Sequence, residues 1–257
     1  MDLNTGFDVA FGGNSLNQIN IMNNEGAIAS YFELSTGLSG CPILTNDGQV
    51  VYNSRWNALQ QIVNDENSNL EVGFYHFLYD PNYYSNAMSC YEQGVVFGMS
   101  LTNTNIPSTY LSLALDIEWA SFNKNTPSVT EVENCVSEFM NGLNSTISGN
   151  FNIMLYLPYS LINALELYNT SLTDYTLWLS YELTNMDPDV NIDVQLQLTN
   201  SQIEQGINLM NSVTWGGYQG WSGWQYAISN NETLYIDLDI FNMDAIYNSG
   251  MYYNPTN

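Results

Sequence analysis

Short runs of apolar residues alternate along the chain with longer stretches in which apolar residues recur every three to four positions. The runs are typical of buried strands, and the three-to-four spacing is typical of amphipathic helices. The pattern predicts eight strands, at residues 6–10, 28–34, 72–78, 112–119, 151–157, 176–181, 222–228 and 234–240. After about residue 175 the helical spacing weakens, and the last three strands follow in close succession.

The clearest helix is predicted between the fourth and fifth strands. Ser128 and Glu131 form a capping box there, directly ahead of apolar residues at helical spacing. Three weaker apolar stripes predict further helices around residues 56–63, 87–99 and 161–168.

Alternating strands and helices favour a parallel sheet with right-handed crossovers, and eight strands can close such a sheet into a barrel. We therefore expect an α/β fold, an irregular TIM-like β/α barrel with a β-rich carboxyl-terminal side. No low-complexity segment or linker rich in Pro and Gly divides the sequence, so residues 1–257 are expected to form a single domain.

The composition is acidic because basic residues are missing. Against 26 Asp and Glu the chain has only Arg55 and Lys124, which gives a formal net charge of -24, while 45% of residues are hydrophobic. Two basic residues cannot form a nucleic-acid-binding face, so nucleic acid is excluded as a partner, and anionic membrane surfaces are disfavoured. A chain with few bases gains little positive charge at low pH, so the composition favours adaptation to acid, with high salt as the alternative.

Membrane insertion is not expected, because no run of about 18 apolar residues is present. The amino terminus also lacks the charged and apolar regions of a signal peptide. Cys41, Cys90 and Cys135 are an odd number, so at least one is unpaired within the chain, and the pairing stays open.

Two carboxylates end the fourth predicted strand, where Asp116 and Glu118 follow the apolar residues 113–115. Residues two apart on a strand point to the same face, roughly 6.5–7 Å from each other. Active sites of β/α barrels form at the carboxyl ends of the strands. Two acids in unequal surroundings suit the cleavage of a glycosidic bond, which needs one protonated and one ionised carboxyl group. Alone, such a pair is more often an ordinary solvated strand end than a catalytic site.

Other candidates lie near the ends of predicted strands. They are the acids Asp8, Asp237 and Asp239, the neighbours Tyr75 and His76, and the aromatic residues Tyr156, Trp178, Trp221, Trp224 and Tyr226. Aromatic rings can stack on sugars, although ordinary core packing is the alternative for at least half of them.

Seven motifs in this order make the chain resemble the family-25 glycoside hydrolases, the lysozyme-type muramidases. The matching segments are residues 6–9, 73–77, 115–118, 154–156, 177–179, 224–226 and 237–241, and they span almost the whole chain. The resemblance implies five β/α units and three further strands. It also implies hydrolysis of the β-1,4 bond between N-acetylmuramic acid and N-acetylglucosamine in bacterial peptidoglycan, without a metal or organic cofactor. With the composition, it leads us to expect a secreted enzyme in an acidic environment.

The resemblance also assigns roles to residues. Glu118 matches the general acid/base, and Asp116 matches the partner carboxylate, which either attacks the anomeric carbon or orients the N-acetyl group of the substrate. Asp8 and Asp237 match flanking acids of the site. The substrate groove is expected to include Tyr75, His76, Tyr156, Trp178, Trp224 and Tyr226.

The sequence departs from the family pattern at two positions, and two alternative functions are weighed against the resemblance. Asp239 stands where the family usually has Asn, and a basic residue common on the second strand is missing, with Glu33 near its place. A chitinase-like barrel requires Asp-x-Asp-x-Glu, whose first position is Ala114 here. A catalytically inactive glycan-binding barrel would have no need to keep several close acids that repel each other.

Overall fold

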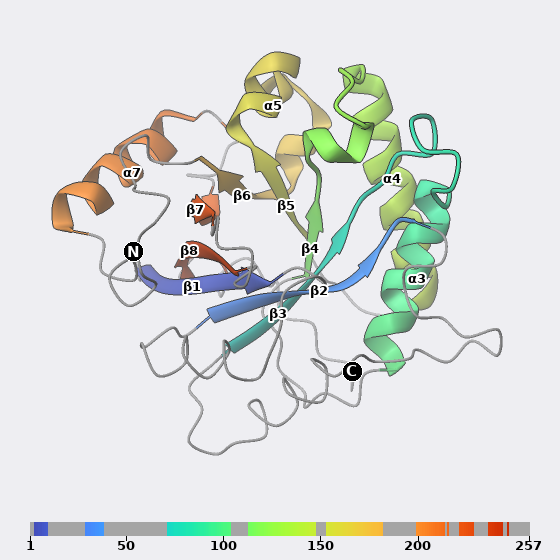
Figure 1. Ribbon diagram of the computed structural model, residues 1–257, viewed down its shortest axis with the longest axis horizontal. Coiled ribbons are helices and arrows are strands. Elements are labelled where there is room, and N and C mark those ends of the chain that lie inside the picture. Colours follow the sequence, from blue (N-terminus) through green and yellow to red (C-terminus); the bar gives the residue numbers. More distant parts are fainter. Residues whose placement is uncertain are drawn as a thin grey trace.

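A computed structural model describes residues 3–9, 29–38, 71–103, 113–147, 153–181, 199–213, 215, 221–228, 236–243 and 246. Eight strands pair in chain order and form a closed barrel (Figure 1). They are β1 (Leu3–Val9), β2 (Ala29–Thr36), β3 (Glu71–Phe77), β4 (Leu113–Asp116), β5 (Ile153–Pro158), β6 (Thr176–Ser180), β7 (Trp221–Ile228) and β8 (Ile236–Asn242). The mixed α/β class is confirmed.

Strands β1 to β7 run parallel to their neighbours, whereas β8 is antiparallel to both β7 and β1. The amino end of β8 therefore lies beside the carboxyl ends of the parallel strands. Asp8 near the end of β1 is opposite Asp237 near the start of β8. One end of the barrel thus gathers residues from both ends of the sequence.

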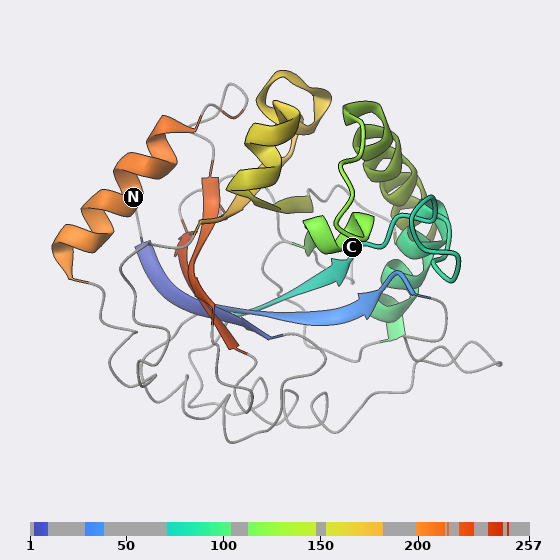
Figure 2. The same ribbon diagram turned by 45° about the horizontal axis from the view of Figure 1, so that its top comes forward.

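Helices lie outside the barrel wall (Figures 1 and 2). Those described are α3 (Cys90–Asn103), α4 (Val129–Thr146), α5 (Tyr159–Leu165) and α7 (Asn200–Ser212), with short 3₁₀ helices η1 (Trp119–Phe122), η2 (Leu167–Asn169) and η3 (Ser171–Asp174). The predicted capping box is confirmed at α4, where Glu131 N donates to Ser128 Oγ at 3.2 Å and Ser128 N donates to Glu131 Oε2 at 2.6 Å. The helix predicted at residues 56–63 lies outside the described residues.

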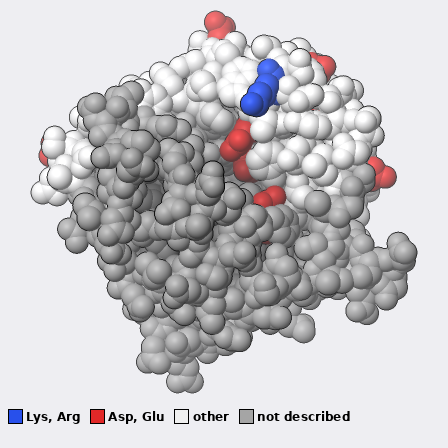
Figure 3. Space-filling model, viewed as in Figure 1, with Lys and Arg blue, Asp and Glu red and all other residues white. Residues whose placement is uncertain are grey.

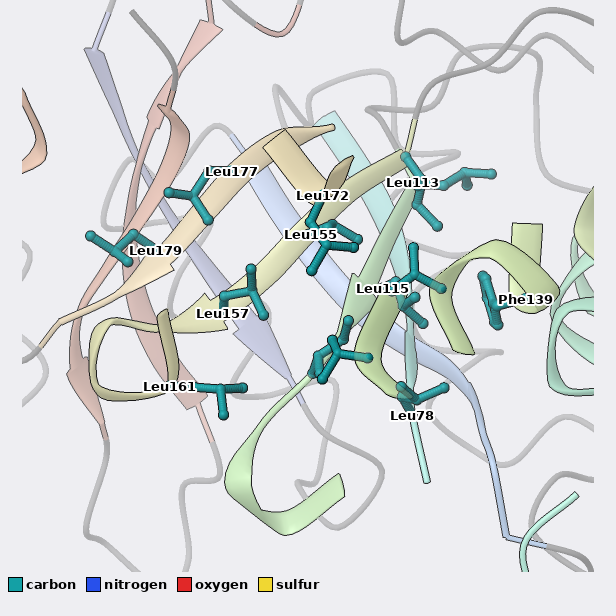
Figure 4. Packing of buried hydrophobic residues seen from close by; sticks show 14 of the residues in the cluster. Leu78, Leu113, Leu115, Phe139, Leu155, Leu157, Leu161, Leu172, Leu177 and Leu179 are labelled. Carbon is teal, nitrogen blue, oxygen red and sulfur yellow. The ribbon is translucent and has the colours of Figure 1, made fainter. Parts of the chain in front are cut away.

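Side-chain alternation separates two apolar clusters on the two faces of the barrel wall. Leucines of β4, β5 and β6 point outward and pack with residues such as Phe139 of α4 and Leu161 of α5 (Figure 4). The interior holds mainly aromatic residues and a few smaller side chains: Tyr31, Tyr75, Ala114, Met154, Tyr156, Trp178, Phe241, Met243 and Ile246. The barrel is therefore filled with aromatic rings beneath the end where Asp8 and Asp116 lie.

Helices α3 and α4 are tied together covalently and by close packing. A disulfide joins Cys90, the first residue of α3, to Cys135 of α4. Gly94 faces the backbone carbonyl of Phe139 so closely that a Cβ would collide with it. The two helices therefore form one rigid pair outside β2 and β3, while Cys41 lies outside the described residues.

Candidate active site

A cleft with a volume of about 100 Å³ opens at the carboxyl ends of the parallel strands. Its lining residues come from β1, β3, β4, β5, β6 and β7: Asp8, Tyr75, Phe77, Asp116, Glu118, Tyr156, Trp178 and Gln225. In the space-filling view, acidic side chains lie in a hollow beside a basic one (Figure 3). The cleft is thus lined by carboxyl groups above aromatic rings.

Asp116 and Glu118 are held by backbone hydrogen bonds on both sides. Asp116 is the last residue of β4, and its carbonyl accepts from Leu78 N at 3.0 Å. Ile117 N donates to the carbonyl of Tyr156 at 3.0 Å. Glu118 N donates to Ser121 Oγ at 3.0 Å, as the chain turns into η1. The predicted strand at residues 112–119 therefore ends at Asp116, and Glu118 projects from a hydrogen-bonded turn.

Burial changes the pKa values of the ionisable side chains around this turn. It raises the pKa of Glu118, so this carboxyl group keeps its proton to higher pH than an exposed glutamate. The pKa of Tyr156 is raised well above its usual range by burial and by the negative charges of Glu118, Asp116 and Asp8. The Tyr156 hydroxyl therefore stays protonated and donates to Gln225 Oε1 at 2.6 Å.

Asp8 lies on β1, across the barrel from Asp116 at the end of β4, and it is only 7% exposed. Its Oδ2 accepts from Gln225 Nε2 at 3.0 Å. Its pKa is raised well above the usual range, first by burial and then by the charge of Asp239. Asp239 is fully buried, and its Oδ1 accepts from the indole Nε1 of Trp178 at 2.8 Å. Burial thus favours the protonated form of both Asp8 and Glu118, and acid-assisted bond cleavage requires a carboxyl group that keeps its proton.

Six of the ten residues expected in the site line the cleft: Asp8, Tyr75, Asp116, Glu118, Tyr156 and Trp178. Asp237 lies on β8 opposite Asp8, and its side chain is outside the described part of the structure. His76, Trp224 and Tyr226 do not line the cleft, and their placement corrects the expectation for the substrate groove.

His76 points away from the cleft because Tyr75, its neighbour on β3, points into it. Ser35 Oγ lies 2.7 Å from His76 Nδ1, and His76 Nε2 donates to Gln93 Oε1 at 3.1 Å. The ring packs against Phe97 and Phe139, and burial lowers its pKa to about 3. His76 is therefore a neutral residue that links the outer face of β3 to β2 and α3.

Trp224 and Tyr226 also face outward. The Trp224 ring lies against Gly206 of α7, and its Nε1 donates to the carbonyl of Tyr181 at 3.0 Å. Gln225 between them points into the barrel and was not predicted as a site residue. Gly223, on the same face as Gln225, leaves room for the indole of Trp178, where a Cβ would come within 2.6 Å of the ring. Once Gly223 is known to face inward, the alternation of side chains along β7 places Gln225 on the inner face as well.

Within the described ranges, no group of three or more His, Cys, Asp and Glu side chains is arranged to hold a metal ion. None of the helices described is both long and apolar enough to cross a bilayer.

A model of the protein family described as glycosyl hydrolases family 25 matches residues 19–233. A search of curated proteins finds no match.

Several solved structures share the fold. A bacterial lysozyme from Streptomyces coelicolor is 16% identical, with a TM-score of 0.57 and coverage of 96% of each chain. A family GH25 lysozyme from Aspergillus fumigatus is 15% identical, with a TM-score of 0.56 and coverage of 94% of each chain. The spore cortex lytic enzyme SleM from Clostridium perfringens is 17% identical, with a TM-score of 0.58, and the match covers 95% of this chain and 69% of that chain.

Proposed function

The chain belongs to glycosyl hydrolase family 25, and from this premise we propose that it is an N-acetylmuramidase acting on bacterial peptidoglycan. The bond cleaved is the β-1,4 linkage between N-acetylmuramic acid and N-acetylglucosamine. The observation that carries the proposal is that Asp116 and Glu118 enter one cleft from the end of a single strand, with Glu118 in surroundings that preserve its proton. Asp8, Asp237 and the inward-facing aromatic residues are assigned to substrate binding.

Glu118 serves as the general acid. It donates its proton to the glycosidic oxygen as the bond from that oxygen to the anomeric carbon breaks, so the leaving sugar departs as a neutral alcohol. Positive charge develops at the anomeric carbon, and ionised Asp116 stabilises it. A water molecule then adds to that carbon and returns a proton to Glu118, which restores the starting state.

Asp116 can act in two ways that the same cleft accommodates. As a nucleophile it would form a covalent bond to the anomeric carbon. As an orienting group it would hold the substrate's N-acetyl oxygen so that this oxygen attacks instead. Both routes retain the configuration of the sugar, whereas a base acting on water would invert it.

We further propose that residues 1–257 form one catalytic barrel of the irregular TIM-like β/α type, with a β-rich carboxyl-terminal side. We also propose that it works outside the cell in an acidic environment. The disulfide between Cys90 and Cys135 favours an oxidising compartment. The missing basic residues favour acid, because they limit the positive charge that a folded chain acquires when its carboxylates are protonated.

The test is the loss of turbidity of a purified cell-wall suspension, with analysis of the new reducing ends. Muramic acid at the new reducing end supports the proposal. Activity on chitin alone would indicate a chitinase-like enzyme, and binding without cleavage would indicate an inactive glycan-binding barrel.

The matched variants are Glu118→Gln and Glu138→Gln, the second on the exposed face of α4. Glu118→Gln keeps the shape of the side chain but cannot donate the proton, so we expect less than a tenth of the wild-type rate with an unchanged circular dichroism spectrum. Glu138→Gln controls for the loss of one charge. A Glu118→Gln variant that retains more than a tenth of the rate would refute its role as general acid.

A further inference from the structure

A second pair of carboxyl groups lies in the same barrel. Asp8 extends from β1 and Asp239 from β8, which pair antiparallel with Asp239 opposite Gly6, two positions before Asp8; both side chains are buried on the same face of the barrel wall. An ionised carboxylate has no proton to donate, so a hydrogen bond between two carboxyl groups needs one of them protonated. Two buried carboxyl groups at such adjacent positions repel each other when both are ionised, so their surroundings favour one of them keeping its proton.

No basic group among the described residues balances two negative charges at this place. Apart from His76, the titratable side chains described on the strands around the pair are all acids: Tyr31 and Glu33 on β2, Glu71 and Tyr75 on β3, Asp116 at the end of β4, Glu118 after it, Tyr156 on β5 and Tyr226 on β7. Asp237, opposite Asp8 on β8, adds another acid whose side chain lies outside the described part of the structure. The described basic side chains are Lys124, which is exposed, and His76, which lies on the outer face of β3. Ionisation of both Asp8 and Asp239 would leave two buried like charges near each other.

The pair is connected to the catalytic end of the cleft by side-chain hydrogen bonds. Asp239 accepts from Trp178, and Asp8 accepts from Gln225 Nε2. Gln225 Oε1 in turn accepts from the hydroxyl of Tyr156 at 2.6 Å and from Ser180 Oγ at 2.9 Å. The oxygen of the Gln225 amide accepts two hydrogen bonds, and its nitrogen donates one to Asp8. The orientation of the amide therefore depends on Asp8 staying in place.

We propose that Asp8 and Asp239 share one proton, and that this proton holds Gln225 and Tyr156 in position beside Asp116 and Glu118. Asp239 is then a positioning residue for the reaction, and it fills this role only in acid, while the pair keeps its proton. When the proton leaves, repulsion separates the two carboxylates, and Gln225 loses the partner that orients it. Only the activity readout of this inference rests on the proposed function.

The test is Asp239→Asn. The amide can accept from Trp178 and donate to Asp8 without a titrating proton, and it leaves the pair with the same charge as the protonated wild type. We expect the basic limb of the pH–activity profile to move upward by about one pH unit. A role in packing alone would lower activity by the same factor at every pH.

Thermal stability gives a second readout that needs no activity. The folded-state pKa of Asp8 is raised, so the stability that its proton contributes is present below pH 4 and is lost as pH rises through the folded-state pKa. In Asp239→Asn this loss is smaller, so the Tm difference between variant and wild type should shift by about 2–4 °C in favour of the variant between pH 4 and 7. Infrared spectra at pH 6 should show one protonated carboxyl group fewer in the variant.

Asp174→Asn, at an exposed position in η3, controls for the loss of one negative charge and should move neither readout. If Asp239→Asn does not fold, Asp8→Asn places the amide on the other side of the pair, and the same Tm and infrared changes are expected. A Tm difference independent of pH, together with an unchanged count of protonated carboxyl groups, would overturn the inference. Absence of cell-wall hydrolysis by the wild type would refute the proposed function and leave the Tm and infrared tests valid.

Discussion

Asp116 and Glu118 are two positions apart, yet their surroundings differ. Asp116 ends a buried strand and is 8% exposed, whereas Glu118 is more exposed and lies in the turn that follows. We predict that Asp116→Asn reduces turnover by at least about 100-fold, because a neutral amide cannot stabilise the positive charge at the anomeric carbon.

The measurement for Asp116→Asn is the rate of cell-wall hydrolysis together with NMR of the nascent reducing sugar. Asp174→Asn serves as the charge-matched control. Retained configuration in the wild-type product agrees with either proposed route. An inverted product would exclude both routes and make Asp116 a base that activates water.

The acids of the site were predictable from sequence, because each interrupts an apolar strand near its end. Which face a neighbouring aromatic residue occupies was harder to predict. On β3 and β7 both alternate sets are largely apolar or aromatic, so hydrophobicity does not show which set points inward. His76, Trp224 and Tyr226 were misplaced for this reason. The β-bulge between Glu33 and Ser35, which brings Ser35 opposite His76, has no sequence signal of its own.

At the scale of elements, helix α4 begins where its capping box predicts, since Ser128 and Glu131 satisfy the exposed backbone donors locally. The end of β4 was predicted three residues too late, because the run of apolar residues continues through Ile117 and Trp119. The hydrogen bonds between Glu118 and Ser121 that end the strand are not visible as a pattern. Local capping chemistry is therefore easier to predict than the point at which a strand turns into a loop.

The pair α3 and α4 supports β3 from outside, and its disulfide is a distinct target for a prediction. The double variant Cys90→Ser with Cys135→Ser should lower the free energy of unfolding by about 2–4 kcal/mol, because the link closes a loop between residues 45 apart in sequence. Urea denaturation monitored by circular dichroism measures this loss.

Reduced wild-type protein is the control for the disulfide prediction, and it should show a similar loss of stability. Activity at low temperature should survive in the double variant, because neither cysteine lines the cleft. Equal stability of the oxidised, reduced and double-variant proteins would show that the link contributes nothing.

For the whole molecule, we predict that stability is greatest in mild acid. His76 has a folded-state pKa of about 3 against an ordinary 6.5, so the unfolded chain binds its proton more readily and stability falls as pH drops from 6.5 towards 3. This loss reaches up to about 5 kcal/mol. Burial raises the pKa values of Asp8 and Glu118, and the stability from their protons is lost as pH rises.

Circular dichroism melts from pH 2 to 8 should therefore give a Tm maximum between about pH 4 and 6. Activity should have its optimum below about pH 5, where Glu118 is protonated and the negative charge of the whole chain is reduced. In His76→Gln, Tm should be lower at pH 6 but should fall less between pH 6 and 3. A Tm maximum above pH 7 would show that the shortage of basic residues is not an adaptation to acid.

The pairing of β1 with β8 has a consequence for how the protein is made. Gln225 and Asp8 are 217 residues apart in sequence, and their hydrogen bond forms only after the last strand has closed the barrel. Contacts of this range form late and slow the folding of a chain. A nascent polypeptide emerging from the ribosome therefore carries Asp116 and Glu118 long before it can assemble the wall that orients them. Hydrolytic competence therefore arrives only once β8 has been synthesised and has joined β1 to β7.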